Sequence, residues 1–258
     1  TCLVGESGCG KSLTARAILG ILPRGATAAG SVRFEDRELI GLPEKTMSRL
    51  RGRSMAMIFQ EPMTALNPVL TVGEQAAEPL RLHLGLSKAE ARKRVVELFA
   101  EVGIPSPGER YTVYPHELSG GMRQKVAIAR TLVTAPDINL MDEPFSALDY
   151  QTRTGLQCFF LQLWAKLRET ILFVTHEVEE AVFLSDYIVV INPVPSSIKK
   201  IIHVELPRPR RRDDPDVLNL SAEVLHYYGA GTCMADQELK KALDILAANK
   251  AKREAMRG

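Results

Sequence analysis

The chain has 258 residues, of which 45% are hydrophobic, 25% charged and 6% aromatic, and these values are ordinary for a globular protein. A formal net charge of +2 gives no reason to expect a nucleic-acid partner. The four cysteines lack C-x-x-C spacing and no apolar run approaches the ~20 residues of a membrane-spanning helix, so we expect free thiols in a reducing compartment and no membrane span.

Hydrophobic periodicity predicts strands that alternate with helices, a pattern typical of a mostly parallel sheet covered on both faces. In chain order, the predicted elements are a strand ending at residue 4, a helix over 11–22, strands over 31–34 and 55–59, a helical stretch over 72–102, a helix over 120–133, a strand over 138–141, a helix over 152–168, a strand over 170–175, a helix over 178–184 and a strand over 187–191.

Two features of this pattern concern domain organisation. The helical stretch interrupts the alternation, so we expect a helical subdomain over about 61–135 inserted into one domain over 1–228. Within it, Ser87 and Glu90 have the spacing of a capping box, and Gly103 is placed to end a helix. Residues 229–258 are predicted to form a separate helical extension of unknown role.

The chain begins with a glycine-rich loop that fits the pattern G-x-x-x-x-G-K-[ST] between a strand and a helix. Glycines let backbone amides point at phosphate oxygens, and the helix start favours anions. A lysine there can reach the β- and γ-phosphates, and a following serine hydroxyl can bind Mg²⁺. The predicted nucleotide-binding residues are Gly5, Ser7, Gly8, Cys9, Gly10, Lys11 and Ser12.

Two carboxylates, Asp142 and Glu143, end the apolar strand that begins at Ile138. In a chain with a phosphate loop, Asp142 can join the Mg²⁺ shell and Glu143 can orient and deprotonate the attacking water. The pair by itself is weak evidence for a catalytic site, because strand ends often carry acidic residues. Asn139 in the same strand is polar and needs a hydrogen-bond partner if it is buried.

Ser119, Gly120 and Gly121 open a predicted helix and form a second possible anion site. Two such sites in one chain make sense if two copies pair head to tail, each capping the nucleotide of the other. An ordinary helix cap is the alternative.

Two further polar residues follow predicted strands. His176 comes after the strand over 170–175, where a γ-phosphate would lie, and Gln60 follows the strand over 55–59. A lone histidine is more often structural, and a glutamine is an ordinary strand end, so both candidates depend on position.

In their order along the chain, these motifs resemble the nucleotide-binding domain of ABC transporters over about residues 1–206. Residues Gly5–Ser12 resemble the Walker A motif and residues 138–143 resemble Walker B. Gln60 resembles the glutamine of the Q-loop, and His176 resembles the histidine of the H-loop. The signature motif resembles 118–122, with methionine in its last position, and the D-loop resembles 146–149.

The resemblance implies an α/β P-loop NTPase fold of the ABC-ATPase type, and ATP hydrolysis coupled to transport. ATP and Mg²⁺ would be the cofactors, with Ser12, Gln60 and Asp142 as metal ligands. Glu143, His176 and Gln60 would be catalytic, and Asp149 would join the two active sites.

The implied partners are a second ATPase subunit, identical or different, transmembrane permease subunits and, indirectly, a periplasmic or lipid-anchored solute-binding protein. The implied location is the cytoplasmic face of the bacterial inner membrane, as a peripheral subunit. Upstream strands with an adenine-stacking aromatic residue, which the family carries, are missing, so we expect a truncated N-terminal β-subdomain and weak ATP affinity.

The transported solute is ambiguous. The stretch 57–68 and the following helices resemble oligopeptide or nickel importers. From Tyr114 onward, the stretches 141–149, 174–181 and 206–210 resemble the nitrate, sulfonate and taurine importers. The larger C-terminal match favours the second group, with a peptide or nickel importer as the alternative. A non-transport ABC ATPase is a further alternative, although the chain has neither a long coiled-coil insertion nor tandem domains.

Overall fold

The structure is a computed structural model that describes residues 1–60, 66–167, 169–193 and 196–228. The chain divides into two compact units. The first contains Thr1–Ser12 and the chain from Phe173 onward, and the second is Leu13–Leu172. We describe each unit by itself.

Parallel strands form the centre of the first unit. Strand β1 (Cys2–Gly5) pairs in parallel with β6 (Thr170–Thr175) over Phe173 to Thr175, and with β7 (Tyr187–Ile191) on its other side. Strand β8 (Ile198–His203) pairs with β7 in the antiparallel direction. All of β1 is buried, as expected for a central strand of a parallel sheet.

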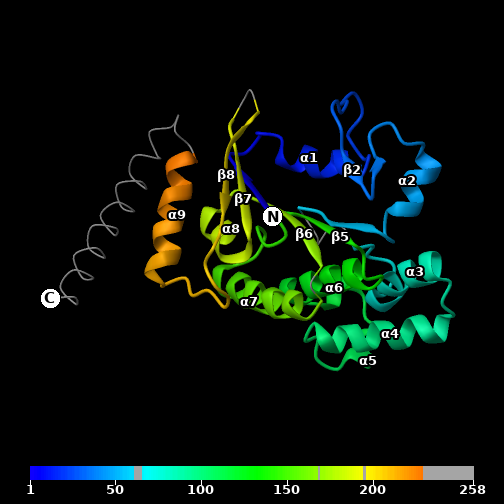
Figure 1. Cartoon of the computed structure of the whole chain (residues 1–258). Helices are drawn as coiled ribbons and strands as arrows, with labels where there is room; N and C mark the ends of the chain where they lie inside the picture. The colour runs from blue at the N-terminus through cyan, green and yellow to red at the C-terminus, as the bar shows by residue number, and fades with distance from the viewer. Residues whose placement is uncertain (61–65, 168, 194–195, 229–258) are drawn as a thin grey trace. The chain divides into compact units, whose positions relative to one another are not determined.

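The helices of this unit are α8 (Val178–Leu184) and α9 (Pro215–Tyr227), together with the start of α1 (Lys11–Ile18). Helix α9 packs against α8 and β8, as Figure 1 shows. Its buried side chains include Val217, Ser221 and Val224, which share one stripe of the helix.

The second unit contains a parallel pair of strands, β4 (Met55–Ile58) and β5 (Ile138–Asp142). The register pairs Ile58 with Met141, so both strands end at the same edge. A short antiparallel hairpin, β2 (Arg33–Phe34) and β3 (Arg37–Glu38), is followed by α2 (Glu44–Leu50).

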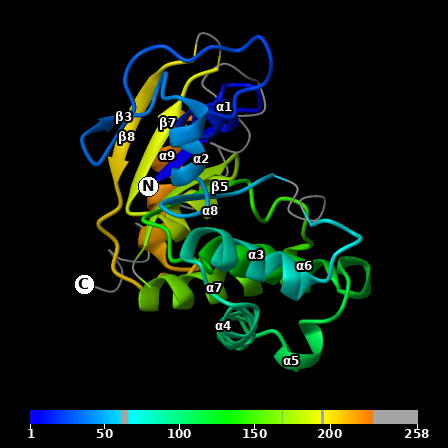
Figure 2. The same ribbon diagram turned by 90° about the vertical axis from the view of Figure 1, so that its right-hand side faces the viewer.

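The remaining helices of the second unit form a packed layer. Figure 2 views α4 end-on, with α3 above it, and α6 packs against both. These elements are α3 (Val72–Leu84), α4 (Lys88–Glu101), α5 (Pro107–Arg110), the 3-10 turn η1 (Pro115–Glu117), α6 (Gly120–Leu132) and α7 (Tyr150–Leu167).

The predicted helical stretch over 72–102 is in fact two helices. Gly85 adopts a left-handed conformation (φ 68°) and ends α3, and the predicted capping box then starts α4. In that box, Ser87 Oγ accepts from Glu90 N (3.3 Å), and Glu90 Oε2 accepts from Ser87 N (2.9 Å). The prediction of Gly103 as the end of α4 is confirmed by its φ of 66°.

Several elements were not predicted, namely β3, α2, α5, η1, β8 and α9. The predicted helical subdomain stays a prediction, because its first residues, 61–65, lie outside the described residues, as does the whole predicted extension over 229–258.

Candidate functional site

The glycine-rich loop joins β1 to α1, as predicted. Gly8 (φ 82°) and Gly10 (φ 90°) both lie in the left-handed region, which residues with a side chain rarely adopt. This backbone reverses the chain within a few residues and delivers Lys11 to the first position of α1.

Lys11 folds back onto its own loop and is only 4% exposed. Its ammonium donates to Gly5 O (2.6 Å) and Glu6 O (2.9 Å), and its third contact is Cys9 Sγ at 3.7 Å. The loop therefore holds a buried positive charge by means of backbone carbonyls, which suits it to receive an anion.

Gly5 lies where no side chain fits. A Cβ built at this position would lie 2.7 Å from Cys9 Sγ and 2.8 Å from Ile191 O. The second contact is with the backbone of β7, which cannot move aside easily. The sequence pattern requires a glycine here, and the packing of β1 against β7 gives the physical reason.

His176 lies at the same sheet edge as the phosphate loop. Strands β1 and β6 are parallel neighbours, and their register pairs Val4 with Thr175, so the loop and His176 leave adjacent strand ends. His176 is exposed. The predicted association of this histidine with the loop thus has a geometric basis within the first unit.

The acidic pair ends β5 in the second unit. Asp142 is fully buried, whereas Glu143 is partly exposed and has a positive φ of 44°. A glutamate seldom adopts this conformation, which is typical of strained functional positions. Its carbonyl accepts from Ser146 Oγ (2.9 Å), which stabilises the turn.

Gln60 and Glu143 meet at the edge where β4 and β5 end. Gln60 Nε2 donates to Glu143 Oε2 at 3.3 Å. The parallel register of the two strands explains the contact, since residues that follow adjacent parallel strands emerge side by side.

The buried Asn139 has the hydrogen-bond partner that the sequence required. Its Nδ2 donates to Glu169 Oε2, and Trp164 Nε1 donates to Glu169 O at 3.0 Å. Burial raises the pKa of Glu169 to about 7, and the Asn139 hydrogen bond opposes that rise. Sequence reasoning did not find Glu169, because nothing in its local sequence marks it.

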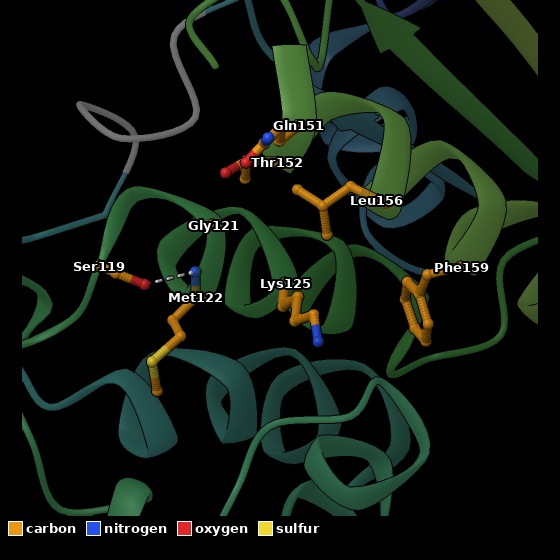
Figure 3. Close-up of a pocket in the computed structure, with 9 residues that line it drawn as sticks. Ser119, Gly121, Met122, Lys125, Gln151, Thr152, Leu156 and Phe159 are labelled. Carbon is orange, nitrogen blue, oxygen red and sulfur yellow. Dashed lines mark hydrogen bonds between the residues drawn. The ribbon is translucent and has the colours of Figure 1, made fainter. Parts of the chain in front are cut away.

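Ser119 caps α6, with Oγ accepting from Met122 N at 3.3 Å (Figure 3). A Cβ built at Gly121 would lie 3.0 Å from Thr152 Cγ2, so α6 and α7 approach closely here. A pocket of about 390 Å³ lies beside this contact; the figure shows Lys125 and Phe159 among its lining residues.

Asp149 lies just before α7 and is exposed. Its Oδ1 accepts from Thr152 N at 3.1 Å, and the hydrogen bonds from Thr152 hold the pKa of Asp149 below its usual value. Asp149 therefore caps the start of α7.

The residues predicted to bind Mg²⁺ fit a magnesium ion by their chemistry. Ser12, Gln60 and Asp142 offer hydroxyl, amide and carboxylate oxygens, which are the hard ligands that Mg²⁺ prefers. Among the described residues, no group of three or more His, Cys, Asp or Glu could hold a metal.

The structure distributes the predicted site residues over the two units. The phosphate loop and His176 belong to the first unit. The second holds Gln60, Ser119, Gly120, Gly121, Asp142, Glu143 and Asp149.

Together, a parallel α/β fold and a glycine-rich loop around a buried lysine define a P-loop nucleotide-binding protein. Residues 1–146 match the family model described as "ABC transporter", and the chain belongs to that family. The fold is that of an ABC ATPase. The chain is similar to a solved structure of the ATP-binding cassette MJ0796, with a TM-score of 0.67 and 26% identity. The similarity covers 80% of this chain and 85% of that one, and that structure is a dimer in a post-hydrolysis state bound to ADP and phosphate.

Curated relatives of the chain are named as peptide transporters. The chain is 43% identical over 190 residues to the dipeptide transport ATP-binding protein DppD of Bacillus subtilis, covering 73% of this chain and 57% of the relative. It is 42% identical over 188 residues to the oligopeptide transport ATP-binding protein OppD of Salmonella typhimurium, covering 73% and 56%. The chain thus spans a little over half the length of these relatives.

These relatives support the peptide alternative better than the nitrate, sulfonate and taurine interpretation.

Within the described part of the chain, no helix has the length and apolar character needed to cross a membrane.

Proposed function

We propose that this chain is the ATP-binding and ATP-hydrolysing subunit of a bacterial importer that takes up dipeptides or oligopeptides. Membership of the ABC transporter family and the similarity to DppD and OppD support this function. The observation that carries the ATP-binding part of this proposal is the phosphate loop, in which two backbone carbonyls hold the buried ammonium of Lys11.

Nucleotide binding falls to residues 5–12 in this proposal. Backbone amides of Gly8, Cys9 and Gly10 face the phosphates, and Lys11 gives up part of its contact with the loop to reach them. Ser12, Asp142 and Gln60 would hold Mg²⁺, which would supply positive charge to offset that of the phosphates.

Hydrolysis depends on Glu143 as the general base that orients and deprotonates water, and on His176, which holds the transferred phosphate. The hydrogen bond from Gln60 occupies a carboxylate oxygen of Glu143 in the structure described here. The hydrogen bond therefore links the residue proposed to sense the nucleotide directly to the proposed base.

The remaining partners follow from the family. Two copies, or this chain and a related subunit, would pair head to tail, with Ser119, Gly120 and Gly121 on the nucleotide of the partner and Asp149 joining the two sites. Permease subunits would bind the helices of the second unit at the cytoplasmic face of the inner membrane, and a solute-binding protein would deliver the peptide.

The mechanism is tested with Glu143→Gln, which keeps the shape of the side chain and removes the base. ATP binding, measured by calorimetry, should persist, while turnover, measured as phosphate release, should fall roughly 10²- to 10⁴-fold. Glu97→Gln on the exposed side of α4 is the matched control and should hydrolyse ATP normally. Normal turnover in Glu143→Gln would contradict the assignment of the base.

The solute class is tested by purifying the subunit with its membrane partners from native cells in mild detergent and reconstituting them with their binding protein. Peptides should stimulate ATP hydrolysis, and taurine or nitrate should not. Stimulation by taurine or nitrate alone would instead support the reading based on the C-terminal resemblance.

A further inference from the structure

The hydroxyl of Tyr228 reaches the phosphate loop from the far end of the described chain. Tyr228 Oη donates to Gly5 O at 3.2 Å, across 223 residues of sequence. The same carbonyl accepts from Lys11 Nζ at 2.6 Å. Gly5 is buried at the end of β1, so two side-chain donors meet at one buried acceptor.

The position of Tyr228 is fixed by α9. Tyr228 follows the last residue of that helix, and its amide donates to Val224 O and Leu225 O. It continues the buried stripe of Val217, Ser221 and Val224, by which α9 packs against the unit. At the other end, Asp214 caps the helix by accepting from Asp216 N at 2.8 Å. The hydroxyl is thus carried by a helix that is capped at both ends and packs against α8 and β8.

All three donors of the Lys11 ammonium face acceptors within the loop. An ammonium has three N–H groups, and those of Lys11 face Gly5 O, Glu6 O and the weak acceptor Cys9 Sγ. To contact both the β- and the γ-phosphate, Lys11 must redirect two of them. Breaking the contact with Cys9 Sγ costs little free energy, because sulfur is a weak acceptor. The ammonium must also break its hydrogen bond to one of the two carbonyls.

The cost of leaving a carbonyl depends on what remains bonded to it, because a buried acceptor without a donor is unfavourable. Gly5 O keeps the Tyr228 hydroxyl when Lys11 departs. We infer that Tyr228 is a positioning residue for nucleotide binding: its hydroxyl keeps the Gly5 carbonyl hydrogen-bonded while the Lys11 ammonium moves to the phosphates. This inference rests on the proposed function, since it assumes that the loop binds a nucleotide.

Tyr228→Phe tests the inference, because it removes the hydroxyl and keeps the ring. Its dissociation constants for MgATP and for tripolyphosphate, measured by calorimetry on the full chain, should both rise roughly fivefold, the value of one hydrogen bond. The KM for ATP should rise by the same factor with kcat within twofold of the unmodified chain, and the melting temperature without ligand should change little. The matched control is Tyr227→Phe, since the Tyr227 ring lies under Lys200 Nζ at 5.6 Å and phenylalanine retains that contact.

Weaker binding of both ligands in Tyr228→Phe alone supports the role of the hydroxyl. Unchanged binding overturns it, and so does an equal effect of Tyr227→Phe or a fall in kcat without a change in KM. If the unmodified chain itself shows no saturable binding of MgATP, the proposed function fails and this inference fails with it; unchanged binding in the variant removes the inference alone.

Discussion

At the scale of single residues, the Asn139–Glu169 pair shows how a buried strand tolerates a polar side chain. Asn139 is fully buried, and its amide donates to a carboxyl whose pKa is raised to about 7. The first cause is burial, which disfavours the charged form of Glu169. The carboxyl thus gains charge within the range of pH in which proteins are usually studied.

A raised pKa makes stability depend on pH in a definite direction. The contribution of Glu169 is fully present below its usual pKa of 4.5 and is lost as the pH rises through about 7. Glu169→Gln keeps an oxygen for Asn139 and cannot ionise. We therefore expect the free energy of unfolding of the unmodified chain to fall, relative to the variant, by roughly 1–2 kcal/mol between pH 4.5 and pH 8, a value that allows for solvent screening.

Urea unfolding at several pH values measures this difference. The exposed Glu223 on α9 offers a control, because Glu223→Gln should leave the pH dependence of the unmodified chain in place. Parallel curves for the unmodified chain and Glu169→Gln would show that the carboxyl does not titrate as described.

The candidate site was predictable from sequence at the level of residue identity but not of contacts. The phosphate loop is a local pattern, so its glycines and Lys11 could be named before the fold was known. The bond from Gln60 to Glu143 spans 83 residues, and that from Tyr228 to Gly5 spans 223. Such contacts depend on strand register and helix packing, which no local pattern encodes.

At the scale of elements, Arg210 connects α8 to the chain that follows β8. Its guanidinium donates to Val182 O and Ser185 O, both at 2.7 Å, and to Leu206 O at 3.1 Å. The carbonyls at the end of a helix lack partners within it, so the arginine satisfies them. Burial, followed by the nearby Arg208, lowers the pKa of Arg210 to about 10.

Most arginines of the basic run over 208–212 are held by contacts within the protein and do not form a solvated loop. Arg210 is 6% exposed, Arg208 contacts Asp186 and Leu184 O, and Arg212 lies 4.3 Å from the centre of the Phe183 ring. Of these four arginines, only Arg211 is exposed. The local sequence of a basic run does not show which distant backbone carbonyls its arginines will bind in the fold.

Arg210→Met should lower the free energy of unfolding by about 2–4 kcal/mol, because several buried carbonyls lose their donor. Arg211→Met is the matched control, since Arg211 bonds only to its neighbour Asp213 at the surface among the contacts described for it, and it should change stability little. Both values come from urea unfolding at neutral pH. Similar losses in the two variants would contradict the anchoring role of Arg210.

The elements themselves were predictable to different degrees. The buried strands and α8 were found at or within a residue of their ends, because continuous apolar runs and helical periodicity mark them. Strand β8 was missed because Ile198 and Ile201 are exposed and lysines lie between them, so its pattern does not alternate. Helix α9 had a readable start, Asp214 followed by Pro215, which the sequence interpretation overlooked.

At the scale of the whole molecule, the start of α6 bears on assembly. Ser119 is exposed, and a similar ABC cassette is dimeric. If this helix start binds the nucleotide of a second copy, MgATP should convert Glu143→Gln from 28.5 kDa to twice that mass. Size-exclusion chromatography with light scattering measures the change.

Adding Ser119→Glu to Glu143→Gln should prevent this dimer, because a carboxylate would face the phosphates. Ser87→Glu, at the exposed start of α4, is the matched control; it also removes a serine helix cap and should leave the dimer intact. A dimer that tolerates Ser119→Glu would separate α6 from the interface.

The two-segment composition of the first unit has a consequence for synthesis. Strand β1 pairs only with strands that begin at residue 170 or later among those described, so neither of these neighbours of the phosphate loop's strand exists until about 160 further residues have been made. At ~5–20 residues per second, the ribosome needs roughly 10–30 s for that stretch. During this interval the apolar strand β1 lacks both of its sheet neighbours, so chaperones that shield apolar segments have time to bind it.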